Sequence, residues 1–74
     1  MNKSAVAVNI VHKLQENSIT SKNMAKRLNV TNETFSRWIS GERMPTAYAL
    51  YRMAKIFNCT MEELMEGIEN ENFS

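Results

Sequence analysis

The chain has 74 residues, of which 43% are hydrophobic, with a formal net charge of +1 and a single cysteine. From this length we expect one domain with one small core and no separate effector domain. Cys59 has no second cysteine to pair with and no signal peptide is apparent, so we expect the protein to lie in a reducing cytoplasm. No apolar run approaches the ~18 residues that span a membrane, so we do not expect a membrane-spanning protein.

The net charge hides an uneven distribution along the chain. Residues 1–55 hold all nine Lys and Arg against three Glu, which leaves +6, whereas residues 56–74 hold five Glu and no basic residue, which leaves −5. A basic body of this kind suits a polyanionic partner, with the acidic end turned away from it. Chance and a solvated tail remain the simpler explanation of the same pattern.

Apolar residues recur at helical spacing, and no alternating stretch is long enough for a strand. Val6, Ile10 and Leu14 lie four residues apart. They predict a first helix over about 5–17, with Ser4 as its N-cap.

A second and a third helix follow after short interruptions. Thr20 is placed to cap a helix over about 21–28, which Asn29 ends because asparagine tolerates the left-handed conformation. Thr31 is placed to cap the next helix, over about 32–40.

The rest of the chain predicts two further helices. Gly41 closes the third helix, and Pro45 forbids its continuation through the following turn. Thr46 begins a fourth helix that Asn58 ends. Thr60 then begins a short fifth helix, in which Glu63 completes a capping box. We therefore expect an all-α domain over residues 1–68, followed by an acidic, frayed tail over residues 69–74.

The helix at 32–40 has two unlike faces. At 100° per residue, its large apolar side chains fall within an arc of roughly 100° and its polar ones within roughly 140°. The apolar set is Phe35, Trp38 and Ile39. The polar set is Asn32, Glu33, Ser36, Arg37 and Ser40. A solvated helix face is usually rich in long Lys and Glu, whereas these side chains suit hydrogen bonding to base edges or phosphates.

The spacing around this helix resembles that of a known family. An eight-residue helix, a three-residue turn and a second short helix occupy residues 21–40, with the small Ala25 where the two helices must cross closely. This arrangement resembles the helix-turn-helix of the phage repressor and Cro family, also called XRE-like. "SGERMPT" resembles the Gly-x-x-x-Pro loop of that family, and "MAKIFNCTMEEL" resembles its closing helices. The resemblance covers roughly residues 10–66 and implies a compact five-helix, lambda-repressor-like DNA-binding domain.

Two positions depart from the family pattern. Asn29 stands where many members have glycine, which is a mild physical change. Many members also pair an arginine on the first helix with a glutamate near the end of the third. Leu14 and Ile39 occupy these positions here, and since packed apolar residues can replace a buried ion pair, we expect them to be neighbours.

The resemblance implies that the helix at 32–40 enters the major groove of double-stranded DNA while the preceding helix crosses the backbone. Carried over by position, the residues that read bases are Asn32, Glu33, Ser36 and Arg37. Those that hold phosphates are Ser21, Lys22, Thr31, Ser40 and Arg43. Arg37 suits guanine, Asn32 adenine and Glu33 a cytosine amino group, although Glu33 also suits the helix dipole.

The leading interpretation is a sequence-specific transcriptional regulator that binds DNA as a homodimer. The alternative is a protein-interaction module, or an antitoxin that binds both DNA and a protein partner. The C-terminal residues expected to form the dimer surface are Met61, Leu64, Met65 and Ile68. No enzyme activity, cofactor or metal is expected, because the chain has no Asp and no Gly-rich phosphate loop, and His12 has no second ligand at suitable spacing.

Overall fold

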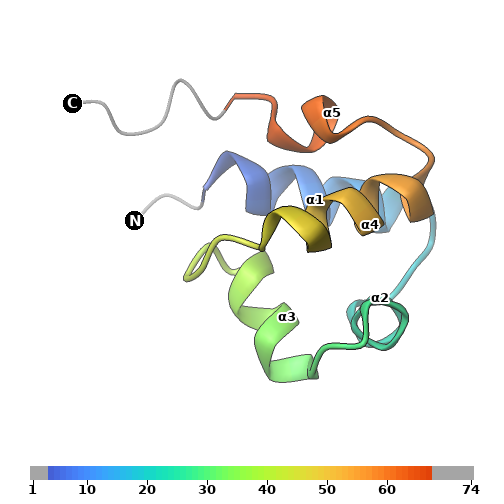
Figure 1. Cartoon of the computed structure of the whole chain (residues 1–74), viewed down its shortest axis with the longest axis vertical. Helices are drawn as coiled ribbons and strands as arrows, with labels where there is room; N and C mark the ends of the chain where they lie inside the picture. The colour runs from blue at the N-terminus through green and yellow to red at the C-terminus, as the bar shows by residue number, and fades with distance from the viewer. Residues whose placement is uncertain (1–3, 68–74) are drawn as a thin grey trace.

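The structure is a computed structural model of the chain, in which residues 4–67 are described. The five helices in these residues are α1 (Ala5–Glu16), α2 (Ser21–Leu28), α3 (Asn32–Ile39), α4 (Ala47–Phe57) and α5 (Met61–Met65). Figure 1 shows α2 and α3 at one end of the molecule, α5 at the other, and α1 and α4 between them. The predicted all-α, five-helix fold is confirmed. The expected acidic tail lies outside the described residues.

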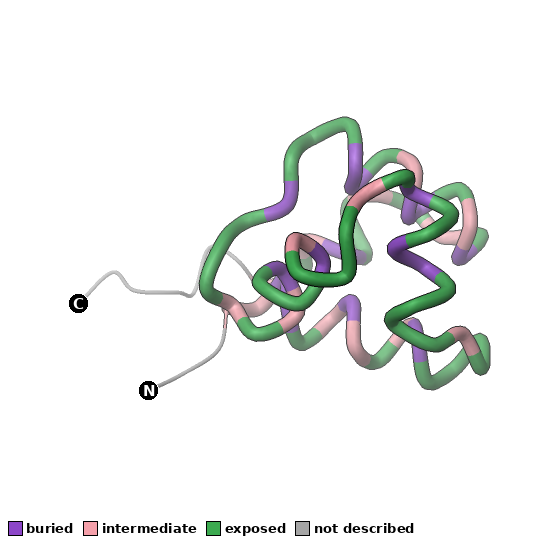
Figure 2. Tube along the Cα trace, turned by 90° about the horizontal axis from the view of Figure 1, so that it is seen from below, coloured by how far each residue is buried: buried purple, intermediate pink, exposed green. Residues whose placement is uncertain are grey.

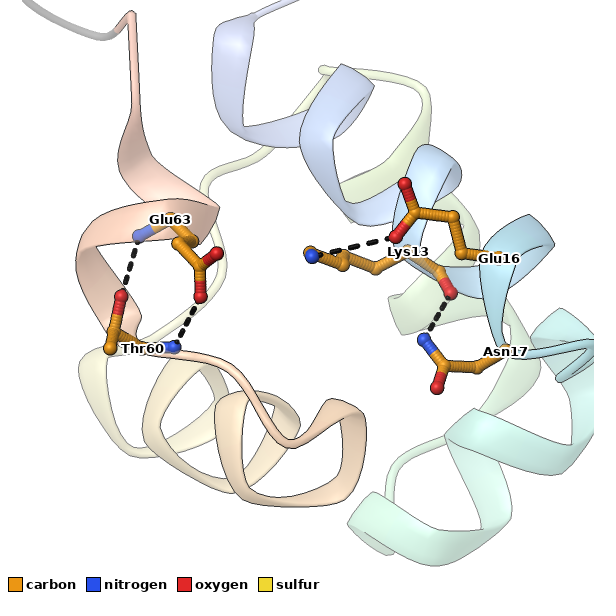
Figure 3. Close-up of polar contacts among 5 residues, drawn as sticks. All are labelled: Lys13, Glu16, Asn17, Thr60 and Glu63. Carbon is orange, nitrogen blue, oxygen red and sulfur yellow. Dashed lines mark hydrogen bonds and ion pairs between the residues drawn. The ribbon is translucent and has the colours of Figure 1, made fainter.

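Every helix begins after a hydroxyl side chain, as the sequence predicted. The five N-cap residues are Ser4, Thr20, Thr31, Thr46 and Thr60. Each hydroxyl oxygen accepts a hydrogen bond from the backbone N–H three residues later, at 3.0–3.1 Å. The Glu63 carboxylate also accepts from the backbone N–H of Thr60 at 2.9 Å, which completes the capping box (Figure 3). Each cap contributes about 0.5–2 kcal/mol, which matters for helices this short.

Two helices end in the left-handed conformation predicted for asparagine. Asn29 ends α2 with φ 61°, and Asn58 ends α4 with φ 59°. Gly41 follows α3 with φ 86°, where a residue with a Cβ would be strained. Helix α1 ends one residue earlier than expected, and Ser18 adopts φ 55° in the turn after it, which the sequence did not indicate.

All five helices contribute to one core, and Figure 2 shows the buried positions recurring between exposed ones along the trace. Phe35 and Trp38 of α3 are 1% and 6% exposed and meet edge to face, with ring centres 6.0 Å apart. Leu14 is buried, Ile39 packs against the same core, and both line one groove between α1 and α3. The two positions that replace the family's ion pair are therefore held in one apolar environment.

Helix α5 is attached to α1 by an interaction that the sequence did not reveal. The side-chain amide of Asn9 donates to the carbonyl oxygens of Leu64 and Glu66, both at 2.9 Å. Leu64 is fully buried. The short helix is thus fixed by one buried leucine and one amide that bonds the end of its backbone.

The prediction of a dimer surface from C-terminal apolar residues is wrong for Leu64, which lies in the core. Leu64 has no exposed surface, and Met61 and Met65 are half-buried against the core. Ile68 lies outside the described residues. The core uses these side chains because α5 packs against both α1 and α4.

The junction of α1 with α5 also holds the cysteine. Cys59 is half-buried and packs against the core, and its burial raises the pKa of its thiol. Nearby, the Lys13 ammonium lies 3.4 Å from the Glu16 carboxylate (Figure 3). Burial lowers the pKa of Lys13, but the attraction and hydrogen bond of Glu16, together with the charges of Glu63 and Cys59, outweigh it, so the pKa is raised overall.

Leu14→Arg should destabilise the fold by about 3 kcal/mol or more, because it places an unpaired cation in the apolar groove beside Ile39. Adding Ile39→Glu should recover part of the loss by supplying the partner. Urea unfolding of both single variants and the double variant measures the coupling, with the exposed His12→Arg as control. Simple additivity would mean that the two positions are not neighbours.

Asn9→Ala should cost about 1–3 kcal/mol, because the Leu64 carbonyl loses its donor in a partly buried site. Hydrogen exchange of the α5 amides should accelerate more than that of α3. Asn17→Ala is the matched control, since the Asn17 amide donates only to an exposed carbonyl of its own helix, at 2.8 Å (Figure 3). Equal losses in the two variants would rule out a special role of Asn9.

Candidate nucleic-acid interface

A tight turn joins α2 to α3. After Asn29, the backbone N–H of Val30 donates to the carbonyl of Ala25 at 3.0 Å, and Thr31 then begins α3. Ala25 is 1% exposed, so no side chain separates the helices where they approach. The local signals for this turn, a left-handed asparagine and a threonine cap, are the ones that the sequence predicted.

The polar face of α3 lies in solvent. Phe35 and Trp38 occupy the core, while every member of the predicted polar set is exposed, namely Asn32, Glu33, Ser36, Arg37 and Ser40. Within residues 4–67, the side chains of Asn32, Glu33, Ser36 and Arg37 make no hydrogen bond or ion pair. Four of the five polar side chains therefore keep their hydrogen-bonding capacity for an external partner. We call these four residues the α3 polar face.

Two of the residues expected to hold phosphates have internal roles. The Thr31 hydroxyl accepts from the backbone N–H of Thr34 at 3.0 Å and donates to the Thr34 hydroxyl at 2.9 Å. The Ser40 hydroxyl donates to the Arg37 carbonyl at 3.1 Å and accepts from the Glu42 N–H at 3.3 Å. Either hydroxyl must give up its internal donor bond before it can donate to a phosphate. The primary effect of both is to shape the two ends of α3.

The loop after α3 is folded back on that helix. The backbone N–H of Arg43 donates to the Arg37 carbonyl at 3.1 Å, and that of Gly41 donates to the Trp38 carbonyl at 3.3 Å. Pro45 is buried, which anchors the end of the loop. The exposed Arg43 side chain therefore extends from a backbone held beside the last turn of α3.

Basic residues border the α3 polar face on the α2 side. A surface hollow of about 330 Å³ lies between the helices, and its walls are Lys22, Lys26, Asn29, Val30 and Asn32. The first turn of α2 has no acidic residue, and Ser21 and Lys22 are exposed there. The first backbone N–H groups of a helix have no intrahelical acceptor, so this end favours an anion.

Other classes of site find little support in the described residues. No group of three His, Cys, Asp or Glu in residues 4–67 is arranged to hold a metal ion. Across the same residues, no helix is both long and apolar enough to cross a membrane. The sequence reasoning did miss one surface. Tyr48 and Tyr51 are exposed on α4, and the signal was present, because both fall outside the i, i+3, i+4 stripe that forms the core face of that helix.

Comparison with known proteins agrees with this geometry. A family model described as Helix-turn-helix (HTH_3) matches residues 12–64, which is more than two thirds of the chain and includes all of α2, the turn and α3. Searches of curated proteins and of solved structures gave no match. The chain belongs to the XRE (Cro/C1-type) family of helix-turn-helix DNA-binding proteins.

Proposed function

We propose that the chain is a sequence-specific transcriptional regulator of the repressor or Cro kind, which acts in the cytoplasm and reads the DNA major groove with α3. The observation that carries the proposal is the α3 polar face, whose four side chains are exposed and have no partner within the described residues. Polar groups left free on a helix that a buried aromatic pair holds in place suit recognition better than stability. Family membership supports DNA binding in general, and the side chains support this particular surface.

Each residue of the α3 polar face has a chemistry that matches a base edge. Arg37 suits a bidentate contact to guanine O6 and N7, and Asn32 suits adenine N6 and N7. Glu33 accepts from a cytosine amino group, and Ser36 pairs with either kind of edge. Glu33 also lies in the first turn of α3, where its charge interacts favourably with the helix dipole. Its loss would therefore affect both base contact and the stability of α3.

The surrounding residues are proposed to hold the DNA backbone. Ser21 and Lys22 present the amino end of α2 to a phosphate, as helix N-termini commonly do. Arg43 binds a phosphate with its side chain, from the loop after α3. Thr31 and Ser40 are expected to contribute through neighbouring backbone groups, because their hydroxyls are engaged within the fold. These contacts fix the register of α3 without specifying a sequence.

A protein-interaction module is the second candidate function, and α4 is what favours it. A face made for protein docking is expected to carry exposed aromatic residues. The α3 polar face has none, whereas α4 exposes Tyr48 and Tyr51. Protein contact therefore suits α4 and DNA suits α3. An antitoxin would use both surfaces, with a toxin as its protein partner.

Arg37→Ala should weaken binding to the cognate duplex by about 1–3 kcal/mol and relax the preference at one base position. Binding to random DNA should fall much less. The fold should persist, because Arg37 lies opposite the buried side of α3. Titrations against cognate and scrambled duplexes measure both effects. Unchanged binding on every duplex would end the proposal for α3 and favour the protein-interaction module.

Arg43→Ala is the matched comparison, because it removes the same group from the adjacent loop. It should weaken all duplexes similarly and reduce the slope of log K against log salt by about one. Titration at two or more salt concentrations separates the two variants. A sequence-dependent loss at Arg43 would assign that side chain to base contact instead.

Two copies should bind half-sites whose centres are about 10 bp apart, or a multiple of that distance. A single helix of eight residues contacts too few base pairs for useful specificity, so a homodimer is part of the proposal. Selection of bound sequences from random duplexes identifies the site and its symmetry together. Selected sites without any inverted or direct repeat would argue against dimeric binding.

A further inference from the structure

The outer face of α4 carries side chains that the core leaves in solvent. Tyr48 is 67% exposed and Tyr51 is 48% exposed, and Met44 in the preceding loop is 50% exposed. At 100° per residue, the tyrosines share an arc of roughly 100° with Arg52 and Lys55, opposite the buried residues of the helix. Exposed aromatic side chains beside cations are typical of contact surfaces between proteins. We call Tyr48, Tyr51, Arg52 and Lys55 the α4 outer face.

Each tyrosine of the α4 outer face lies beside a cation. The Arg52 guanidinium is 5.8 Å from the centre of the Tyr48 ring, and the Lys55 ammonium is 5.3 Å from that of Tyr51. In the described part of the chain, no carboxylate forms an ion pair with either cation. Residues 43–61 contain no Asp or Glu at all. The face is therefore aromatic and cationic, and it lacks a counter-charge of its own.

A surface of opposite character lies at α5. A surface hollow of about 600 Å³ is lined by Thr60, Glu62, Glu63, Met65 and Glu66. The three glutamates are exposed, and Met65 is half-buried. Within residues 4–67, none of the three carboxylates forms an ion pair. Carboxylates beside a methionine suit an ammonium group and an aromatic ring, which are the groups that the α4 outer face presents. We call these five residues the α5 hollow.

We infer that the α4 outer face of one copy binds the α5 hollow of a second copy, and that this contact forms the homodimer. The inference rests on the proposed function, which requires two copies on DNA. We infer a two-fold dimer, in which each chain contributes both surfaces and the contact forms twice in one isologous interface. A second copy is favoured over an unrelated acidic protein, because the chain itself supplies the acidic surface that the cationic face lacks.

Charge reversal on each surface gives a test that needs no DNA. Lys55→Glu places a carboxylate on the α4 outer face, opposite the glutamates of the α5 hollow, and leaves that face with no net charge beside Arg52. Glu62→Lys/Glu66→Lys leaves two lysines against one glutamate in the α5 hollow, so both surfaces are then basic. Each variant alone should dimerise at least about 10-fold more weakly than the unmodified chain, because like charges then face each other. In an equimolar mixture the carboxylate introduced by Lys55→Glu meets the introduced lysines, and the unchanged α4 outer face of one variant meets the unchanged α5 hollow of the other. Association should therefore return to within about threefold of the original. Sedimentation velocity over a concentration series measures the association.

Two controls separate this contact from general charge effects. Glu16→Lys reverses an exposed charge on α1 outside both surfaces and should leave association unchanged. Tyr51→Ala removes the aromatic contact and should weaken association in every mixture, because no charge change on the partner replaces the ring. Thermal unfolding checks that each variant folds, as expected for substitutions at exposed positions.

The outcomes separate this inference from the proposed function. The contact is supported only if association recovers in the equimolar mixture of the two variants. A monomeric unmodified chain, or a mixture as weak as its components, overturns it. Binding of the unmodified chain to DNA is measured in parallel. Self-association without any DNA binding would contradict the proposed function. DNA binding without recovery of association in the mixture would contradict only the interface.

Discussion

The burial of Phe35 and Trp38 is the interaction on which the proposed DNA-reading surface depends. An isolated helix of eight residues is only marginally stable in water, so α3 owes its structure to its caps and to the core. The two aromatic rings meet edge to face at 6.0 Å and fix the rotation of α3 about its own axis. This rotation determines that Asn32 and Arg37 lie in solvent. A less constrained α3 would not present a defined set of groups to a partner.

The fold separates opposite charges in space as well as in sequence. Basic residues lie at the α2 and α3 end of the molecule, where Lys22, Lys26 and Arg37 are exposed. The glutamates of α5 lie at the other end (Figure 1). This arrangement keeps the glutamates of α5 away from a polyanion that approaches α3. It also leaves an acidic surface free for contacts that do not compete with DNA.

Helix α4 carries the α4 outer face and is also bonded to α2, the first helix of the helix-turn-helix. Its inner side lies in the core, and its outer side carries the exposed tyrosines. Arg52 donates to the Arg27 carbonyl at 3.1 Å, which ties α4 to the last turn of α2. The same guanidinium lies against Tyr48. A partner bound at the α4 outer face would therefore contact the helix that supports α2.

The sequence by itself determined the helices and the two faces of α3, because caps, left-handed asparagines and apolar periodicity act over a few neighbouring residues. Thr31 and Asn29 needed no distant partner to mark their helix ends. Only the tertiary structure decided that Leu64 belongs to the core and that Asn9 holds the end of α5 across 55 residues of sequence. Those outcomes depend on which helices pack together. Periodicity shows which side of a helix is apolar, but it does not show whether the same chain or a partner covers that side.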